Sequence, residues 1–129
     1  MKIKLTGVYV DNQEKALAFY TEILGFVKKR DISAGEYRWL TVVSPEDPEG
    51  TELVLEPNAN PAAQTYQQSL FEQGIRAAAF FVDDIQEEYD RLSDLGVAFI
   101  NEPTKTPGST FAAFYDTCGN LIQIVQLDY

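Results

Sequence analysis

An internal repeat constrains the fold of this chain more than any other feature of its sequence. Residues 8–26 read VYVDNQEKALAFYTEILGF, and residues 80–99 read FFVDDIQEEYDRLSDLGVAF. In each stretch an apolar strand pattern ends in Val-Asp, a helical pattern follows, and Leu-Gly precedes a new strand pattern. Such internal similarity predicts two copies of one supersecondary unit, which we call modules.

Capping signals mark where the two predicted helices begin. Asp11 or Asn12 can cap the first helix, and Glu14 stands three residues after Asp11, as in a capping box. In the second module Asp84 precedes Glu87 by the same spacing. Each helix is followed by a glycine, which is favoured just after a helix C-terminus: Gly25 and Gly96.

Further strand patterns follow each helix, so that each module is predicted to be βαβββ and the chain α+β. The patterns lie at residues 26–29, 37–43 and 51–56 in the first module, and at 98–100, 110–115 and 121–127 in the second. Between the modules, Asn60 can cap a linking helix, Pro61 suits its first position, and Gly74 suits its end. We therefore expect one domain, with modules 1–58 and 75–129 joined by a helical linker 59–74.

Size and charge limit the classes of partner. A chain of 129 residues is long enough for one domain with a core, and it has no apolar run near the about 20 residues that span a bilayer. The net charge of −10 disfavours nucleic acid and anionic membranes as partners. An acidic surface usually serves solubility, although it also favours a cationic small molecule. The start of the chain reads as a strand and not as a signal peptide, so we expect a cytoplasmic location.

The chain has no histidine and a single cysteine, Cys118. The absence of histidine removes the commonest general base and the commonest transition-metal ligand, and it excludes Ser-His-Asp and Cys-His nucleophilic sites. Cys118 lies in a predicted turn, and no neighbouring base in the sequence indicates a reactive thiol.

Both helices and the closing segment DTCGNLIQIVQ (residues 116–126) resemble the vicinal oxygen chelate superfamily. This superfamily contains glyoxalase I, bleomycin-resistance proteins and extradiol dioxygenases, and the resemblance covers nearly all of the chain. It implies a single domain in which two βαβββ modules form a mixed-sheet half-barrel, with the helices outside. It also implies a homodimer, in which modules pair within one chain or between two.

The resemblance further implies four ligand positions for one divalent ion, on the first and last strands of each module. Carried over to this sequence, the two first-strand positions are Leu5 and Ala77, neither of which can bind a metal. The closing-strand position, usually a glutamate, is Gln123.

The fourth position has more than one assignment. Alignment of the turns before the last strands places Val54 opposite Gln123, whereas a family-style reading of TELVLEP selects Glu52 or Glu56. These three residues share one strand face because they alternate. At best, one carboxylate and one amide oxygen remain as ligands, which is fewer than zinc or non-haem iron sites use. We therefore predict no cofactor, with a divalent metal as the alternative.

If the family geometry holds, the side chains on the face of the lost ligands line a small-molecule cavity. Trp39 is predicted either as core or as a wall of this cavity, and Gln123 either as a satisfied interior amide or as a ligand contact. The same choice applies to Phe111, Phe114 and Tyr115. The predicted ligand-binding residues are Leu5, Tyr9, Trp39, Val54, Glu56, Ala79, Phe81 and Gln123.

Two functions remain open at this point. The first is a glyoxalase/bleomycin-resistance-like protein that binds a small apolar or cationic molecule in the half-barrel cavity without a metal. The second is a metal-dependent lyase, isomerase or dioxygenase with a weak oxygen-ligand site at Glu56 and Gln123, suited to Mg²⁺ or Mn²⁺. No residue spacing identifies a catalytic pair, and nothing in the sequence supports a purely regulatory domain.

Overall fold

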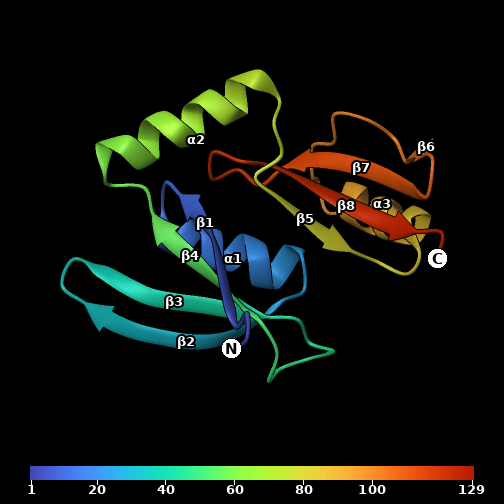
Figure 1. Ribbon diagram of the computed structural model, residues 1–129. Helices are drawn as coiled ribbons and strands as arrows, with labels where there is room; N and C mark the ends of the chain where they lie inside the picture. The colour runs from blue at the N-terminus through green and yellow to red at the C-terminus, as the bar shows by residue number, and fades with distance from the viewer. The chain divides into compact units, whose positions relative to one another are not determined.

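Each half of the chain folds into a four-stranded mixed sheet with a helix on one face, in a computed structural model that describes all 129 residues (Figure 1). The chain divides into two compact units, Met1–Tyr66 and Gln67–Tyr129. The first sheet has the strand order β1-β4-β3-β2. Its strands are β1 (Leu5–Val10), β2 (Val27–Ala34), β3 (Tyr37–Val43) and β4 (Glu52–Pro57).

The second sheet has the corresponding order β5-β8-β7-β6. Its strands are β5 (Ala78–Phe81), β6 (Thr104–Thr106), β7 (Ser109–Tyr115) and β8 (Leu121–Leu127). The helices are α1 (Gln13–Ala18), which continues into the π-helical segment η1 (Phe19–Ile23), α2 (Pro61–Gln73) and α3 (Ile85–Asp94). None of these helices is long and apolar enough to cross a lipid bilayer.

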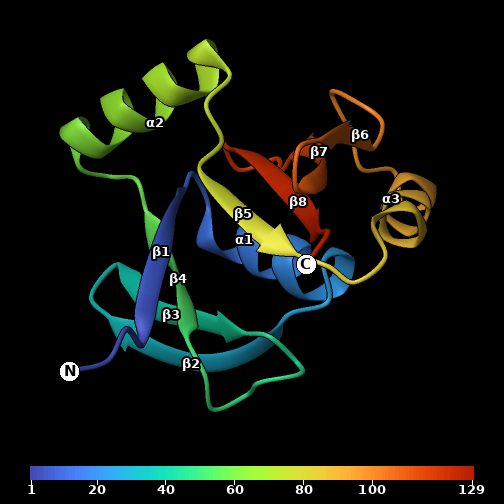
Figure 2. The same ribbon diagram turned by 45° about the vertical axis from the view of Figure 1, so that its right-hand side comes forward.

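The two sheets have the same strand pairing, which confirms the repeat. In each, the first strand of the module pairs in parallel with the last strand: β1 with β4, and β5 with β8 (Figure 2). Gly7 is the partner of Val54, and Ala79 is the partner of Gln123. Val54 is therefore the structural counterpart of Gln123, as the alignment of the two turns predicts.

Two details of the predicted elements are wrong. Residues 98–100 do not form a strand: Phe99 makes only an isolated bridge to Phe114, and the strand in this region is β6. The cap of α1 is Asn12, whose side chain accepts a hydrogen bond from the Lys15 backbone N–H. Glu14 does not complete a capping box, because its carboxylate binds the Arg38 guanidinium.

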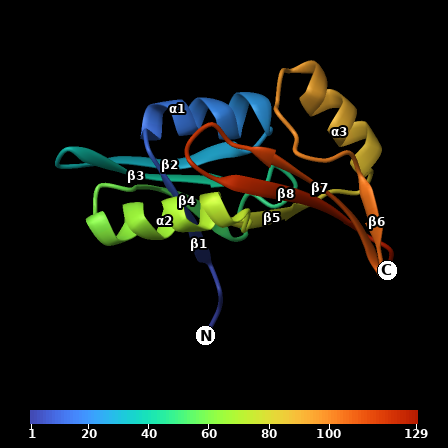
Figure 3. The same ribbon diagram turned by 90° about the horizontal axis from the view of Figure 1, so that it is seen from above.

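The helix of each unit covers one face of its own sheet (Figure 3). Alternate residues of the first sheet, among them Val10, Leu40 and Leu55, are completely buried on the face toward α1. In the second sheet Phe114 and Ile122 are buried in the same way. Because strand side chains alternate, the residues between these belong to the opposite face, which no helix of the same βαβββ repeat covers.

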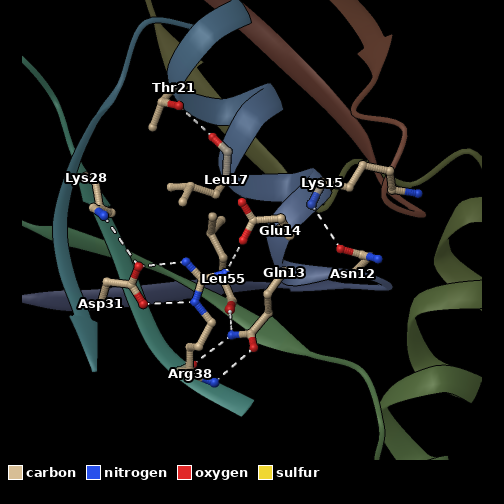
Figure 4. A network of polar contacts seen from close by, with 10 residues as sticks. All are labelled: Asn12, Gln13, Glu14, Lys15, Leu17, Thr21, Lys28, Asp31, Arg38 and Leu55. Carbon is tan, nitrogen blue, oxygen red and sulfur yellow. Dashed lines mark hydrogen bonds and ion pairs between the residues drawn. The ribbon is translucent and has the colours of Figure 1, made fainter. Parts of the chain in front are cut away.

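A polar network fastens α1 to the first sheet (Figure 4). The Gln13 amide donates to the backbone carbonyls of Arg38 at 2.7 Å and Leu55 at 2.9 Å, and its oxygen accepts from the Arg38 N–H at 3.0 Å. The Arg38 guanidinium donates to both carboxylate oxygens of Asp31, at 2.9 and 2.6 Å, and to Glu14 at 2.5 Å. Helix α1 is therefore held on one face of the sheet. We call the opposite face of each sheet, which the helix of its own βαβββ repeat does not cover, the open face.

The hydrogen bonds from Arg38, followed by those from Lys28, lower the pKa of Asp31 from 3.8 to about 2. Because the folded-state pKa is the lower one, this carboxylate stabilises the fold above about pH 4, and the contribution is lost as the pH falls toward 2. We expect Asp31→Asn to reduce the decline in the free energy of unfolding between pH 4 and pH 2, measured by urea denaturation. The exposed Asp94→Asn is the matched control, and a wild-type decline in Asp31→Asn would contradict the expectation.

Candidate functional site

The open face of the first sheet brings five of the predicted ligand-binding residues together. Leu5 and Tyr9 of β1 pair with Glu52 and Glu56 of β4, on the same face as Val54. Thr41 of β3 is the antiparallel partner of Val54, so that Trp39, two residues earlier, lies on this face as well. The five residues are Leu5, Tyr9, Trp39, Val54 and Glu56.

Trp39 is 40% exposed and Leu5 is 45% exposed, although both are large apolar side chains. The alternative of Trp39 as a core residue is therefore wrong. Val54, by contrast, is almost fully buried among its neighbours on the face. The face therefore exposes apolar and aromatic side chains together with a few polar groups, which are the residue types that line small-molecule sites.

The two glutamates of β4 on this face have different environments. Glu52 accepts hydrogen bonds from the Thr41 hydroxyl at 2.7 Å and from Arg30 Nε at 3.0 Å. The Thr41 bond, and then the Arg30 bond, hold the pKa of the Glu52 carboxyl below its usual value. Glu56 is half-buried and makes neither an ion pair nor a side-chain hydrogen bond within the chain. Glu52 is thus neutralised locally, whereas Glu56 is not.

Glu56 lies on the same sheet face as two aromatic residues. Tyr9 is its partner on β1. Trp39 is its expected partner on β3, one same-face step from the Thr41–Val54 pair. A carboxylate that shares a face with aromatic rings attracts a cation by charge, and the rings add a cation–π attraction. This arrangement suits a cationic or apolar aromatic ligand.

Gly7 of β1 lies close to the Val54 side chain of β4, and this close approach requires a residue without a side chain. A Cβ at this position would lie 2.6 Å from Val54 Cγ1 and 3.3 Å from the Val54 carbonyl oxygen. It would also lie 3.5 Å from Glu56 Oε1, so that the Glu56 carboxylate extends over Gly7. Glycine at this position therefore leaves room for both side chains.

The open face of the second sheet carries the other three predicted residues. Gln123 of β8 lies between Ala79 of β5 and Ala113 of β7, which are its partners on the two neighbouring strands. Gln123 is half-buried, and its amide makes no hydrogen bond within the chain. The backbone therefore does not satisfy this amide, which is left for water or a ligand. Phe81, on the same face, is 65% exposed.

The aromatic residues of β7 divide between the two faces of the second sheet. Phe114 is completely buried on the helix side, where its ring meets that of Phe99. Phe111 and Tyr115 lie on the open face, and Tyr115 contacts the Phe71 ring of α2 at 5.5 Å. The Arg76 guanidinium lies over the Phe111 ring, 5.6 Å from its centroid. Sequence reasoning missed Arg76, because no motif surrounds it.

The turn before β8 is fixed by a buried carboxylate that the sequence reading did not single out. Asp116 accepts hydrogen bonds from the backbone N–H groups of Cys118 at 2.8 Å and Asn120 at 3.0 Å, and from the Asn120 amide at 2.8 Å. Gln67 of α2 donates to the Cys118 carbonyl at 3.0 Å. Cys118 is completely buried, so that its thiol is not presented to a substrate. The motif Asp-x-x-Gly-Asn, a turn-forming sequence, was the available signal.

The donor set of the chain does not fit the family's metal centre. Of the four positions that the resemblance implies, Leu5, Ala77 and Val54 have no donor side chain, and Gln123 offers one amide oxygen. No group of three or more His, Cys, Asp or Glu residues is arranged to hold a metal ion. Such a centre normally has three or four protein ligands.

Comparison with known proteins identifies relatives over nearly the whole chain. A model of the Glyoxalase/Bleomycin resistance protein/Dioxygenase superfamily matches residues 2–124. The uncharacterized protein YurT of Bacillus subtilis (strain 168) is 57% identical over 126 residues, which cover 98% of this chain and 99% of YurT. The structure of UcmS2 is 33% identical with a TM-score of 0.83, covering 97% of each chain. TnmS3, an antibiotic binding protein from Streptomyces sp. CB03234, is 30% identical with a TM-score of 0.76, covering 99% of this chain and 97% of TnmS3.

The close approach at Gly7 leads to a stability prediction. We expect Gly7→Ala to lower the free energy of unfolding by about 2 kcal/mol, because the new methyl group meets the short Val54 side chain. In the double variant Gly7→Ala/Val54→Ala, the added methyl group should cost less than in the wild-type background, because its nearest neighbour is gone. Urea denaturation of the four proteins of this cycle measures the coupling. Strictly additive effects would contradict the contact.

Proposed function

Because the chain belongs to the Glyoxalase/Bleomycin resistance protein/Dioxygenase superfamily, we propose that it binds a small apolar or cationic molecule without a metal ion. The observation that carries the proposal is the unneutralised Glu56, which shares an open sheet face with Tyr9 and Trp39. The ligand lies against this face, with an apolar or aromatic part on the Trp39 ring. A positively charged group, where the ligand has one, lies near Glu56.

The free energies of cation–π interaction and of apolar burial support a small apolar or cationic ligand. A cation over an exposed aromatic ring gains about 0.5–1 kcal/mol, and more when the site is desolvated. The net charge of −10 adds a general attraction for cations, which raises their local concentration at the surface. Burial of the ligand's apolar area contributes about 25 cal/mol per Å². On the second sheet, considered by itself, the exposed Ala79 and Phe81 and the half-buried Gln123 are proposed as ligand contacts.

The relatives support binding more than catalysis. TnmS3 is described as an antibiotic binding protein, and it shares the fold and 30% of its residues with this chain. A lyase, isomerase or dioxygenase of the superfamily would use a metal, for which this chain offers the Glu56 carboxylate and the Gln123 amide and no third donor at the expected positions. We therefore assign no catalytic residue and propose no cofactor.

The proposal is tested by titration of ¹⁵N-labelled protein with N-methylquinolinium, a small aromatic cation, in the presence of EDTA. Trp39 is the only tryptophan, so that the spectrum holds a single indole N–H signal. We expect this signal to shift with saturation, and the neutral isostere 1-methylnaphthalene to bind more weakly. We expect Glu56→Gln to raise the dissociation constant for the cation about threefold, as the loss of a partly exposed charge pair predicts.

The control for this experiment is Glu22→Gln, which removes the same charge from an exposed residue of η1. Equal weakening in both variants would show attraction by net charge alone. An indole signal that does not move with either compound would contradict the placement of the ligand on this face.

The proposal also includes a homodimer in the cytoplasm, as the family membership suggests. A reducing compartment suits the single Cys118, which has no cysteine partner within the chain. Nucleic acid is not expected as a partner at this net charge. We expect light scattering after size exclusion to give twice the 14.5 kDa chain mass, and cell fractionation to place the protein in the soluble fraction. A mass of one chain at micromolar concentration would contradict the dimer.

A further inference from the structure

Arg76 is the one arginine of the chain without a carboxylate partner. The chain has 20 acidic and 10 basic residues, so that carboxylates are in excess. Yet Arg76 forms no ion pair, although each of the other three arginines does: Arg30 with Glu52, Arg38 with Glu14 and Asp31, and Arg91 with Glu88. An unpaired guanidinium beside an open sheet face is a candidate for ligand recognition.

The Arg76 guanidinium is held in place from two sides. Its Cζ lies 5.6 Å from the centroid of the Phe111 ring, and Nη1 donates to the Gly74 carbonyl oxygen at 3.1 Å. A guanidinium has five N–H donors, and the Gly74 bond uses one of them. The remaining donors are available to an acceptor outside the chain, and the group loses less freedom on binding because it is already positioned.

The sheet face beside this guanidinium offers a second polar group. Phe111 pairs with Val125 and is the diagonal neighbour of Gln123, about 7–8 Å away on the same face. The Gln123 amide has no partner within the chain. Of its two neighbours across the sheet, Ala79 is exposed, whereas Ala113 is completely buried. A guanidinium, a free amide and an aromatic ring therefore share one face.

We propose that the open face of the second sheet binds a planar aromatic carboxylate. The carboxylate accepts hydrogen bonds from Arg76, whose planar donor fork matches two carboxylate oxygens. The ring of the ligand lies against the exposed Ala79 and Phe81 beside Gln123. Repulsion from the acidic surface is screened beyond about 8 Å at physiological salt, so that the nearby guanidinium decides the local preference. This inference rests on the proposed function, and it adds a ligand class for one sheet face.

The experiment compares 2-naphthoate with 2-naphthalenemethanol, which has the same rings and no charge. Dissociation constants come from ¹⁵N chemical-shift titrations of the full chain at fixed salt and in EDTA. We expect 2-naphthoate to bind about fivefold more tightly and to shift the signals of Arg76, Phe111 and Gln123, as a partly exposed charge-assisted hydrogen bond predicts. Arg76→Gln should remove this preference, and Arg76→Lys should restore only part of it, because a lysine has no planar fork.

The matched control is Lys105→Gln, which removes one positive charge from the same sheet at its pair with Asp128. It should keep the preference for 2-naphthoate. Equal affinities of the two compounds, or a preference that survives in Arg76→Gln, would overturn the inference. If N-methylquinolinium still shifts the Trp39 indole signal in that case, the inference alone is overturned; if neither compound binds, the proposed function is overturned with it.

Discussion

The parallel pairing of the first and last strands within each module is the interaction on which the rest of the structure depends. It sets Gly7 beside Val54 and Ala79 beside Gln123, and it thereby fixes which alternate residues meet a helix. A shift of one residue in either pair would exchange the buried and open faces. The helix-side faces carry the largest buried side chains, and the open faces carry Glu56 and Gln123, whose polar groups have no partner within the chain.

Most of the fold could be predicted from the sequence, because the repeat, the strand periods and the turn residues agree with one another. The predicted β3 and β8 match the structure to the residue. The prediction of a strand at residues 98–100 is wrong because the apolar Phe99 fits a strand pattern without forming a strand. Its ring instead packs against Tyr89 at 4.6 Å and Phe114 at 5.4 Å, which is a tertiary contact with no local signature.

The predicted open-face residues came from alternation along strands, and the structure places them as alternation requires. Sequence reasoning could not distinguish Glu52 from Glu56, because Arg30 and Thr41 reach Glu52 only after β2, β3 and β4 have paired. Arg76 was missed for a similar reason: its contact with Phe111 joins positions far apart in the chain. The alternation of side chains along a strand thus predicts which residues share the open face. Which charged residues on that face lack a partner depends on tertiary contacts.

Metal independence separates a binding protein from the metal-using enzymes of the same superfamily. The most direct measurement is elemental analysis of purified, untagged protein before and after incubation with Mg²⁺, Mn²⁺, Fe²⁺, Ni²⁺ and Zn²⁺, followed by dialysis. A metal-independent binding protein should retain far less than one metal ion per chain under every condition. One retained ion per chain, lost in Gln123→Ala, would contradict metal independence and would favour the lyase, isomerase or dioxygenase alternative.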